Sequence, residues 1–251
     1  MTGIGAAAMM RSALKRVRRY ARRFGYARLL CIPLVVALLM LRVADPLPLH
    51  ELRVRTFDLY QFVKPRQVTQ RPVVIIDIDE KSLSRFGQWP WPRTRVADLV
   101  QRLTDLGAAA IAFDIVFAEP DRLSPAAVAE TFRDLDEDSR ARLRALPDND
   151  RVLADVLRRA PAVLGESGLP KFVPQPELKL PLTGLATLGA APRPFLLKFP
   201  GLLRNIPVLE EAAPGRGLFT IRTERDGIVR RVPMIMEAQG DLMPSLTFEM
   251  L

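Results

Sequence analysis

The sequence predicts an α/β domain with a mixed sheet, preceded by one N-terminal transmembrane helix. The domain is expected to have a parallel βαβ core and a C-terminal β-hairpin. Three observations predict this class: an apolar run near the N-terminus, two β-branched runs separated by an amphipathic helical pattern, and two late strand-like segments joined by Asp226-Gly227. With 251 residues, 49% of them hydrophobic, the chain is long enough to bury a sizeable core.

The apolar run that predicts the membrane helix covers residues 29–41 (LLCIPLVVALLML). Extended to residues 24–44, it gives about 31 Å of helix, which matches the roughly 30 Å hydrocarbon core of a bilayer. Arg28 and Arg42 lie near its two ends, so their side chains can reach toward the lipid headgroups. We therefore predict a transmembrane helix over residues 24–44.

The basic charge of the chain is concentrated ahead of this helix. The formal net charge is +9, and residues 1–28 contain eight Lys and Arg residues and no acid, which leaves +1 for residues 29–251. Because the rest of the chain is nearly neutral, the charge does not predict a nucleic-acid-binding surface. Cytoplasmic flanks of membrane helices are rich in Lys and Arg, so residues 1–23 are expected in the cytoplasm.

A cleaved signal peptide is the alternative interpretation of the same run. Cleavage after Ala44 would place Arg42 where a small residue is required, which favours a retained anchor.

The only cysteine, Cys31, lies inside the run, so the outer domain has no intramolecular disulfide and no cysteine-based zinc site. The only histidine, His50, lies just past the membrane exit and is expected to be an interfacial polar residue, and Ser-His-Asp chemistry has no other candidate base. The sequence predicts no metal and no cofactor.

Residues 73–79 (VVIIDID) and 109–117 (AAIAFDIVF) have the composition of strands that are buried on both faces. Between them, Pro92 suits the first position of a helix and Gly107 suits its C-terminal cap. The apolar positions of this helix recur at helical spacing: Val96, Leu99, Val100, Leu103 and Leu106. Strand, helix and strand predict one right-handed βαβ unit.

The second half of the chain predicts further elements. Asp150 is expected to cap a helix, and residues 162–167 (AVLGES) are expected to form a third strand. Residues 169–214 hold nine of the 22 prolines and predict a long irregular connection. The hairpin strands are expected in residues 217–223 and 228–237, and a final helix is expected to begin at Pro244-Ser245.

Polar side chains cluster where the two predicted strands end, which is the edge at which open α/β sheets bind ligands. Two tryptophans, each followed by proline, are expected to form a stiff rim there. The candidate ligand-binding residues are Asp77, Asp79, Glu80, Ser82, Trp89, Trp91, Arg93, Asp114, Glu119 and Asp121. They form either a ligand pocket or a buried polar network in which carboxylates pair with arginines and cap the helix.

An enzymatic alternative starts from Asp77 and Asp79. A hydrophobic strand followed by Asp-x-Asp resembles the opening motif of haloacid-dehalogenase-type phosphohydrolases, which implies a nucleophile and a general acid. Lys81 stands where that family has threonine or valine, and its later pair of metal-binding aspartates is not evident. The sequence therefore assigns no catalytic residue.

Four blocks of the chain are similar to a family of extracellular sensory domains. In order, they are VVIIDIDEKSLSRFGQWPWPR, DLVQRLTDLGAAAIAFDIVFAEPDR, LPDNDRVLADVLRRAPAVLGES and DGIVRRVPMIMEAQGDLMPSLTFEML. They resemble the type-two CHASE family (CHASE-2), whose members are associated with cyclases and histidine kinases. The resemblance implies a membrane helix, this domain outside the cell, and a cytoplasmic output that is commonly a class III adenylate or guanylate cyclase.

We therefore expect an extracytoplasmic sensory domain in residues 45–251, held at the inner (plasma) membrane by residues 24–44 with residues 1–23 in the cytoplasm. Its expected partners are the lipid bilayer, a second copy in a homodimer, and an unidentified extracellular or periplasmic signal, but no nucleic acid. The expected role is signal transduction to a nucleotidyl cyclase, without catalysis by this chain. Because the 251 residues stop before any output domain, a fragment or a frame-broken gene product is expected.

Overall fold

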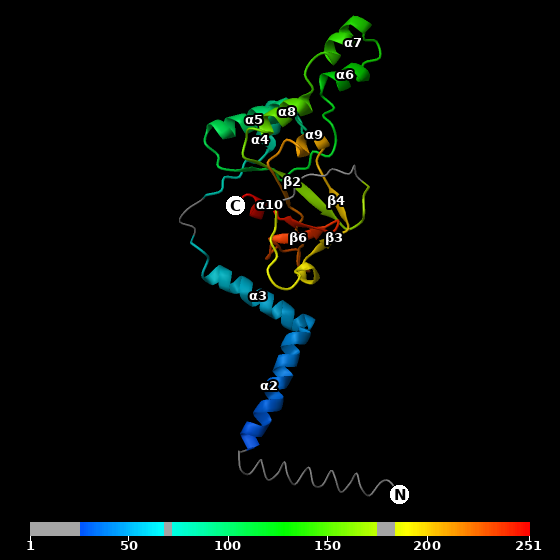
Figure 1. Cartoon of the computed structure of the whole chain (residues 1–251). Helices are drawn as coiled ribbons and strands as arrows, with labels where there is room; N and C mark the ends of the chain where they lie inside the picture. The colour runs from blue at the N-terminus through cyan, green and yellow to red at the C-terminus, as the bar shows by residue number, and fades with distance from the viewer. Residues whose placement is uncertain (1–25, 68–71, 175–183) are drawn as a thin grey trace, which may run out of the picture. The chain divides into compact units, whose positions relative to one another are not determined.

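The computed structural model describes residues 26–67, 72–174 and 184–251 (Figure 1). It divides into two compact units, Met1–Ile76 and Asp77–Leu251. The basic arm predicted for residues 1–23 lies outside the described residues.

The first unit contains two helices that meet at an elbow. Helix α2 spans Tyr26–Ala44 and helix α3 spans Leu47–Val63, with a bend of 80° between them. Asp45, at the elbow, has a positive φ of 40°. Its Oδ2 accepts a hydrogen bond from Arg53 Nη2 at 2.8 Å and lies 3.0 Å from His50 Nδ1. These contacts hold the elbow residue against the first turns of α3.

From Leu30 onward the apolar side chains of α2 are exposed, as Leu30 and Met40 illustrate. Within the described part of the chain, no helix alone has the length and hydropathy to cross a bilayer, while α2 and α3 meet that test together as one bent pair. The membrane span over residues 24–44 therefore stays a prediction.

The second unit contains two small mixed sheets. The first is built around β2 (Ala162–Leu169), which pairs in parallel with β1 (Ile111–Ala112) and β5 (Gly215–Leu218) and antiparallel with β4 (Gly201–Leu203). In the second sheet, β6 (Ile235–Ala238) pairs in parallel with β3 (Lys198–Phe199) and antiparallel with β7 (Asp241–Pro244). The sheet is thus mixed, as predicted, but it is split into two.

The helices of this unit vary in length; α5 and α8 lie near β2, whereas α6 and α7 project away from the sheet (Figure 1). They are α4 (Glu80–Phe86), α5 (Arg93–Asp105), α6 (Pro125–Thr131), α7 (Glu137–Arg144), α8 (Asn149–Leu157), α9 (Pro207–Glu210) and α10 (Leu246–Glu249), with a 3₁₀ turn at Arg193–Phe195. The main core joins α5, α8, α9 and β2 through Val100, Leu157, Leu164 and Leu209. A smaller core lies between the sheets and includes Leu202, Leu218, Met236 and Met243.

The first predicted strand is wrong. Residues 73–79 are extended but form no ladder, and Val74 and Ile75 are 82% and 87% exposed. The second predicted strand is reduced to Ile111–Ala112, although Phe113 N still donates to Val163 O at 3.0 Å. The second and third predicted strands do pair in parallel, as β1 and β2, with α6, α7 and α8 between them in the chain. The βαβ unit therefore lies one element later than predicted.

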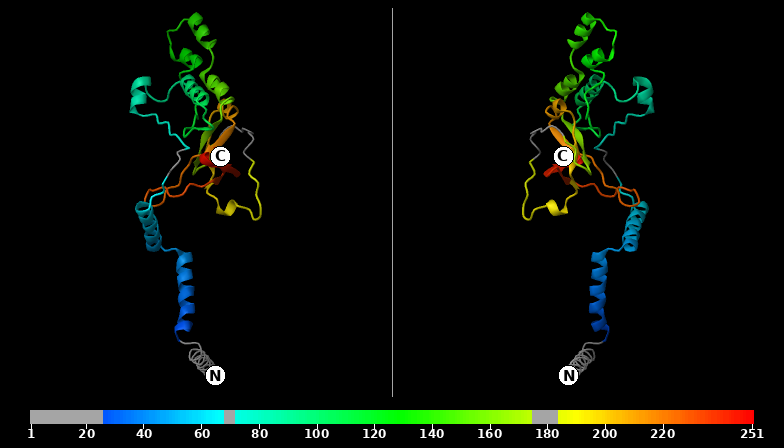
Figure 2. Two further views of the ribbon diagram at one scale, coloured as in Figure 1. Left: turned by 90° about the vertical axis from the view of Figure 1, so that its left-hand side faces the viewer. Right: turned by 90° about the vertical axis from the view of Figure 1, so that its right-hand side faces the viewer.

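The predicted hairpin is only partly formed. Its turn is confirmed, because Gly227 has φ 81° and its N–H donates to Glu224 O at 3.0 Å. The segments on either side of this turn make a long loop between β5 and β6 (Figure 2). The hairpin that enters a sheet is β6–β7, whose turn residues Gln239 and Gly240 have φ of 51° and 92°, as a type I′ turn requires. The last helix was expected to begin at Pro244-Ser245, whereas Pro244 ends β7 and Ser245 caps α10.

Candidate functional site

The candidate site is organised around Arg93, the first residue of α5. Its side chain is buried, and Cζ of the guanidinium lies 4.4 Å from the centre of the Phe117 ring. Nη2 donates to Glu119 O at 3.2 Å, and Nε lies 3.3 Å from Asp150 Oδ1. Arg93 thus joins the start of α5, the segment after β1 and the start of α8.

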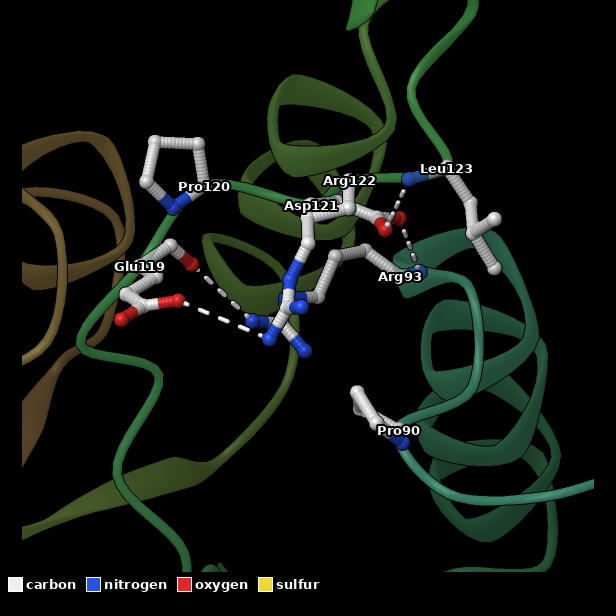
Figure 3. Close-up of a pocket in the computed structure, with 7 residues that line it drawn as sticks. All are labelled: Pro90, Arg93, Glu119, Pro120, Asp121, Arg122 and Leu123. Carbon is white, nitrogen blue, oxygen red and sulfur yellow. Dashed lines mark hydrogen bonds and ion pairs between the residues drawn. The ribbon is translucent and has the colours of Figure 1, made fainter. Parts of the chain in front are cut away.

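Asp121 lies beside Arg93 and accepts three hydrogen bonds. Its Oδ2 accepts from Arg93 N at 2.8 Å and its Oδ1 accepts from Leu123 N at 2.9 Å (Figure 3). Its Oδ2 also accepts from Asn149 Nδ2 at 2.9 Å. A carboxylate at the first N–H groups of a helix satisfies an otherwise unpaired donor and the positive end of the helix dipole. Asp121 therefore caps α5 from a distant part of the chain.

Asp150 completes this network from α8. Its Oδ2 accepts from Asp121 N at 2.9 Å, while its Oδ1 faces Arg93. Burial raises the pKa of Asp150, and the Asp121 N–H and the Arg93 charge partly oppose that rise. The prediction that Asp150 caps α8 is wrong, because the cap is Asp148, whose Oδ1 accepts from Arg151 N at 3.1 Å.

A small pocket opens beside the network (Figure 3). Its lining residues are Pro90, Arg93, Glu119, Pro120, Asp121, Arg122 and Leu123. The pocket has a volume of about 80 Å³. Pockets for drug-sized ligands usually have volumes of roughly 300 to 1,000 Å³, so this pocket suits water or a small ion. The contacts support the polar-network interpretation of these residues over an organic-ligand pocket.

The tryptophans are placed differently from the predicted rim. Trp91 is buried, donates from Nε1 to Gly87 O at 2.8 Å, and packs edge-on against Phe86 and Trp89 with centroid distances of 5.6 and 5.9 Å. Neither tryptophan is among the described residues that line the pocket. Their role here is to pack the end of α4 against the start of α5.

The remaining candidate residues do not reach the Arg93 network. Asp79 caps α4, where its Oδ1 accepts hydrogen bonds from Ser82 N at 2.9 Å and from Ser82 Oγ at 2.7 Å. These bonds lower the pKa of Asp79, and the bond from the Ser82 hydroxyl has the larger effect. Asp77, Glu80 and Asp114 are exposed. Because no strand precedes Asp77, the strand-end arrangement that the phosphohydrolase hypothesis requires is not formed.

A second buried polar network was missed by the sequence reasoning. It lies across β2, α9 and β5, and its charged members are Glu166, Arg204, Glu210 and Arg216. The one signal in the sequence was a glutamate inside the apolar strand segment AVLGES, since charged side chains are rarely fully buried without a partner. Within the described residues, no group of three or more His, Cys, Asp and Glu side chains is placed to hold a metal ion.

These features define the class of protein: a mixed α/β domain with two buried polar networks and a pocket that is small for an organic ligand. A family model described as the CHASE2 domain matches residues 32–251. The chain therefore belongs to the CHASE2 family, whose domains are non-catalytic extracytoplasmic sensors. No curated protein and no solved structure matches the chain. The family predicted from the four sequence blocks is confirmed.

Proposed function

We propose that this chain is the membrane-anchored sensor of a signalling protein that controls a cytoplasmic nucleotidyl cyclase. The observation that carries the proposal is the CHASE2 match over residues 32–251. The topology follows from charge, since residues 1–28 are strongly basic and such flanks stay in the cytoplasm. The apolar α2 is then the anchor, and residues 45–251 face outward.

The proposed mechanism couples packing in the outer domain to the anchor. A signal changes the packing around the Arg93 network or another face of the domain, and α2 shifts against the α2 of a second copy in a homodimer. Such a shift between two packed arrangements is a common way to pass a signal along a helix. The cyclase as the output is supported by the family resemblance.

Topology is tested with single cysteines in the full chain. Cys31 is the only native cysteine, so a Cys31→Ser background carries either Arg122→Cys, at a side chain that is 82% exposed, or Ala7→Cys in the basic arm. A membrane-impermeant maleimide applied to intact cells is expected to label the Arg122→Cys variant only. Both variants are expected to react after lysis, which controls for expression and thiol reactivity.

Labelling of the Ala7→Cys variant in intact cells, with the Arg122→Cys variant protected, would overturn the proposed orientation. Extraction of the protein from membranes by high salt alone would contradict an integral anchor. The homodimer is tested by light scattering of the detergent-solubilised full chain, where a monomer mass contradicts it. The cyclase is tested by reading the DNA that follows the codon for Leu251 in all frames.

A further inference from the structure

Two glutamates lie near each other in the interior of the second unit, because Asn205 Nδ2 donates both to the carbonyl oxygen of Gly165, next to Glu166, at 3.1 Å and to Glu210 Oε1 at 2.8 Å. Glu166 lies on the central strand β2 and is 1% exposed, and Glu210 lies on α9 and is 0% exposed. An ionised carboxylate is costly to bury unless charges and hydrogen bonds compensate it. The contacts of each oxygen therefore decide the charge state of the pair.

Glu210 has well-placed donors on one oxygen. Its Oε1 accepts from Asn205 N at 2.9 Å and from Asn205 Nδ2 at 2.8 Å. Its Oε2 lies 3.2 Å from Arg216 Nε, but the geometry makes no hydrogen bond, and this buried oxygen has no hydrogen-bond partner among the described residues. Glu210 is thus stabilised as a carboxylate that retains one open acceptor.

Glu166 has far weaker compensation. Its Oε1 lies 3.9 Å from Arg204 Nε, which is an ion-pair distance and too long for a hydrogen bond. Its Oε2 is buried and, like that of Glu210, has no hydrogen-bond partner in the described part of the chain. Two carboxylates therefore each leave one buried oxygen unsatisfied.

The other elements around Glu166 and Glu210 contribute two arginines and one further acid. Strand β5 contributes Arg216, and the segment after β4 contributes Arg204. Helix α10 contributes Glu249, whose Oε1 accepts from Arg216 N at 3.4 Å. On the β1 side, Phe117 N donates to Asn205 Oδ1 at 2.7 Å, which fixes the amide that holds Glu210.

We propose that Glu166 and Glu210 share one proton, so that the core of this domain is a proton-binding site occupied at neutral pH. The proton comes from solvent, resides on Glu166, and is donated to the Glu210 carboxylate. A single O–H···O hydrogen bond from Glu166 to Glu210 then involves the two buried oxygens that otherwise have no hydrogen-bond partner among the residues that the structure describes. The pair carries one negative charge instead of two. In agreement, burial and the neighbouring Glu210 carboxylate raise the pKa of Glu166 to about 8.

The shared proton ties β2 to α9 and makes the core sensitive to alkali. Because the pKa of Glu166 in the folded state is raised above its ordinary value of 4.5, the folded protein retains a proton that the unfolded chain has lost. Stability contributed by the pair is full below pH 4.5 and is lost as the pH rises toward about 8. An outward-facing sensor would thereby respond to external alkalinity. The proton site does not depend on the proposed topology.

The test uses the full chain in detergent micelles. Infrared spectroscopy at neutral pH is expected to show the carbonyl band of a buried protonated carboxylic acid, and Glu166→Gln is expected to abolish it. In denaturant unfolding, the folding equilibrium constant of the wild type is expected to fall by up to about tenfold per pH unit between pH 4.5 and 8. In Glu166→Gln, whose amide can donate to Glu210, this pH dependence is expected to be lost.

Glu130→Gln is the matched control. Its partner Arg144 lowers the pKa of Glu130, so this residue titrates below the window and its removal leaves the slope unchanged. Glu210→Gln, which also removes the pair, is the second variant if Glu166→Gln does not fold. Absence of the carboxylic-acid band from the wild type at neutral pH, or an unchanged band in both glutamine variants, would overturn the proposal.

Discussion

Arg93 and Asp150 form an ion pair that is almost completely enclosed, with 3.3 Å between Nε and Oδ1 and side-chain exposures of 9% and 5%. Neither charge is well solvated, so each depends on the other and on Asp121, which binds the backbone N–H of Arg93. Removing one partner of such a pair leaves an uncompensated buried charge, which costs more than the pair itself contributes. The network therefore specifies how α5, α8 and the 117–123 segment fit together.

Asp121→Ala is expected to destabilise the second unit strongly. Three donors, including Arg93 N and Asn149 Nδ2, lose their acceptor together. We expect a loss of about 2–4 kcal/mol in the free energy of unfolding. Denaturant unfolding of the detergent-solubilised full chain, followed by tryptophan fluorescence, measures it.

Glu119→Ala is the control for this measurement. Glu119 lines the same pocket, but only its backbone oxygen binds Arg93 and its side chain is 78% exposed. Removing the Glu119 carboxylate is expected to change the free energy of unfolding by less than about 0.5 kcal/mol. Equal effects of the two substitutions would show that the carboxylate of Asp121 does not hold the network.

Local pattern was enough to predict some elements of this fold. The amphipathic stripe that contains Val96 and Val100 predicted α5, and the apolar run AVLGES predicted β2. Residues 73–79 have the same strand-like composition, yet they pair with no strand and all of them except Ile78 are exposed. Strand propensity describes how well a side chain fits a sheet surface and does not provide a neighbouring strand. Ladder partners are a tertiary property that a single segment does not encode.

The site was predictable to a similar extent. Arg93 and Asp121 do meet, because a helix start and a segment after a strand lie at the same edge. The cap of α8 was assigned to Asp150, whereas the structure has Asp148 there, because both acids lie at the start of this helix and only the contact of Asp150 with Arg93 distinguishes them. Glu166 was overlooked because its partners come from three other elements, none of which is near it in the sequence.

Gly217→Ala is expected to disrupt the junction between β5 and α10. A Cβ atom at Gly217 would lie 2.5 Å from Leu246 Cα and 2.7 Å from Leu246 N, which are backbone atoms that cannot rotate away. We expect a loss of about 1–3 kcal/mol in unfolding free energy, as for other overpacked sites. Gly184→Ala is the matched control, because a Cβ there meets nothing within 4 Å. If both variants unfold at the same denaturant concentration, β5 and α10 are not in the close contact described.

The two tryptophans are expected to differ in solvent access. Trp89 is 36% exposed, whereas Trp91 is 8% exposed and donates to Gly87 O. Since the chain has only these two tryptophans, Trp91→Phe leaves Trp89 as the fluorophore and Trp89→Phe leaves Trp91. Acrylamide is expected to quench Trp91→Phe more strongly than Trp89→Phe. Each variant is the control for the other. Stronger quenching of Trp89→Phe than of Trp91→Phe would contradict the packing of Trp91 against the end of α4.

Acid is expected to weaken the loop between β5 and β6 through Asp226. Its Oδ2 accepts from Arg230 Nη2 at 2.6 Å and its Oδ1 accepts from Ile228 N at 3.1 Å. These bonds, the one from Arg230 first, lower the pKa of Asp226 from 3.8 to about 2. Because the pKa of the folded state is depressed, the stabilisation is present above pH 3.8 and is lost as the pH falls through about 2.

Carboxyl-detected NMR titration of the full chain is expected to place Asp226 at this low pKa, and Arg230→Gln is expected to return it toward 3.8. Asp241→Asn, at the exposed start of β7, is the control and is expected to leave the Asp226 titration unchanged. An Asp226 pKa near its ordinary value in the wild type would mean that the ion pair between Asp226 and Arg230 does not stabilise this turn.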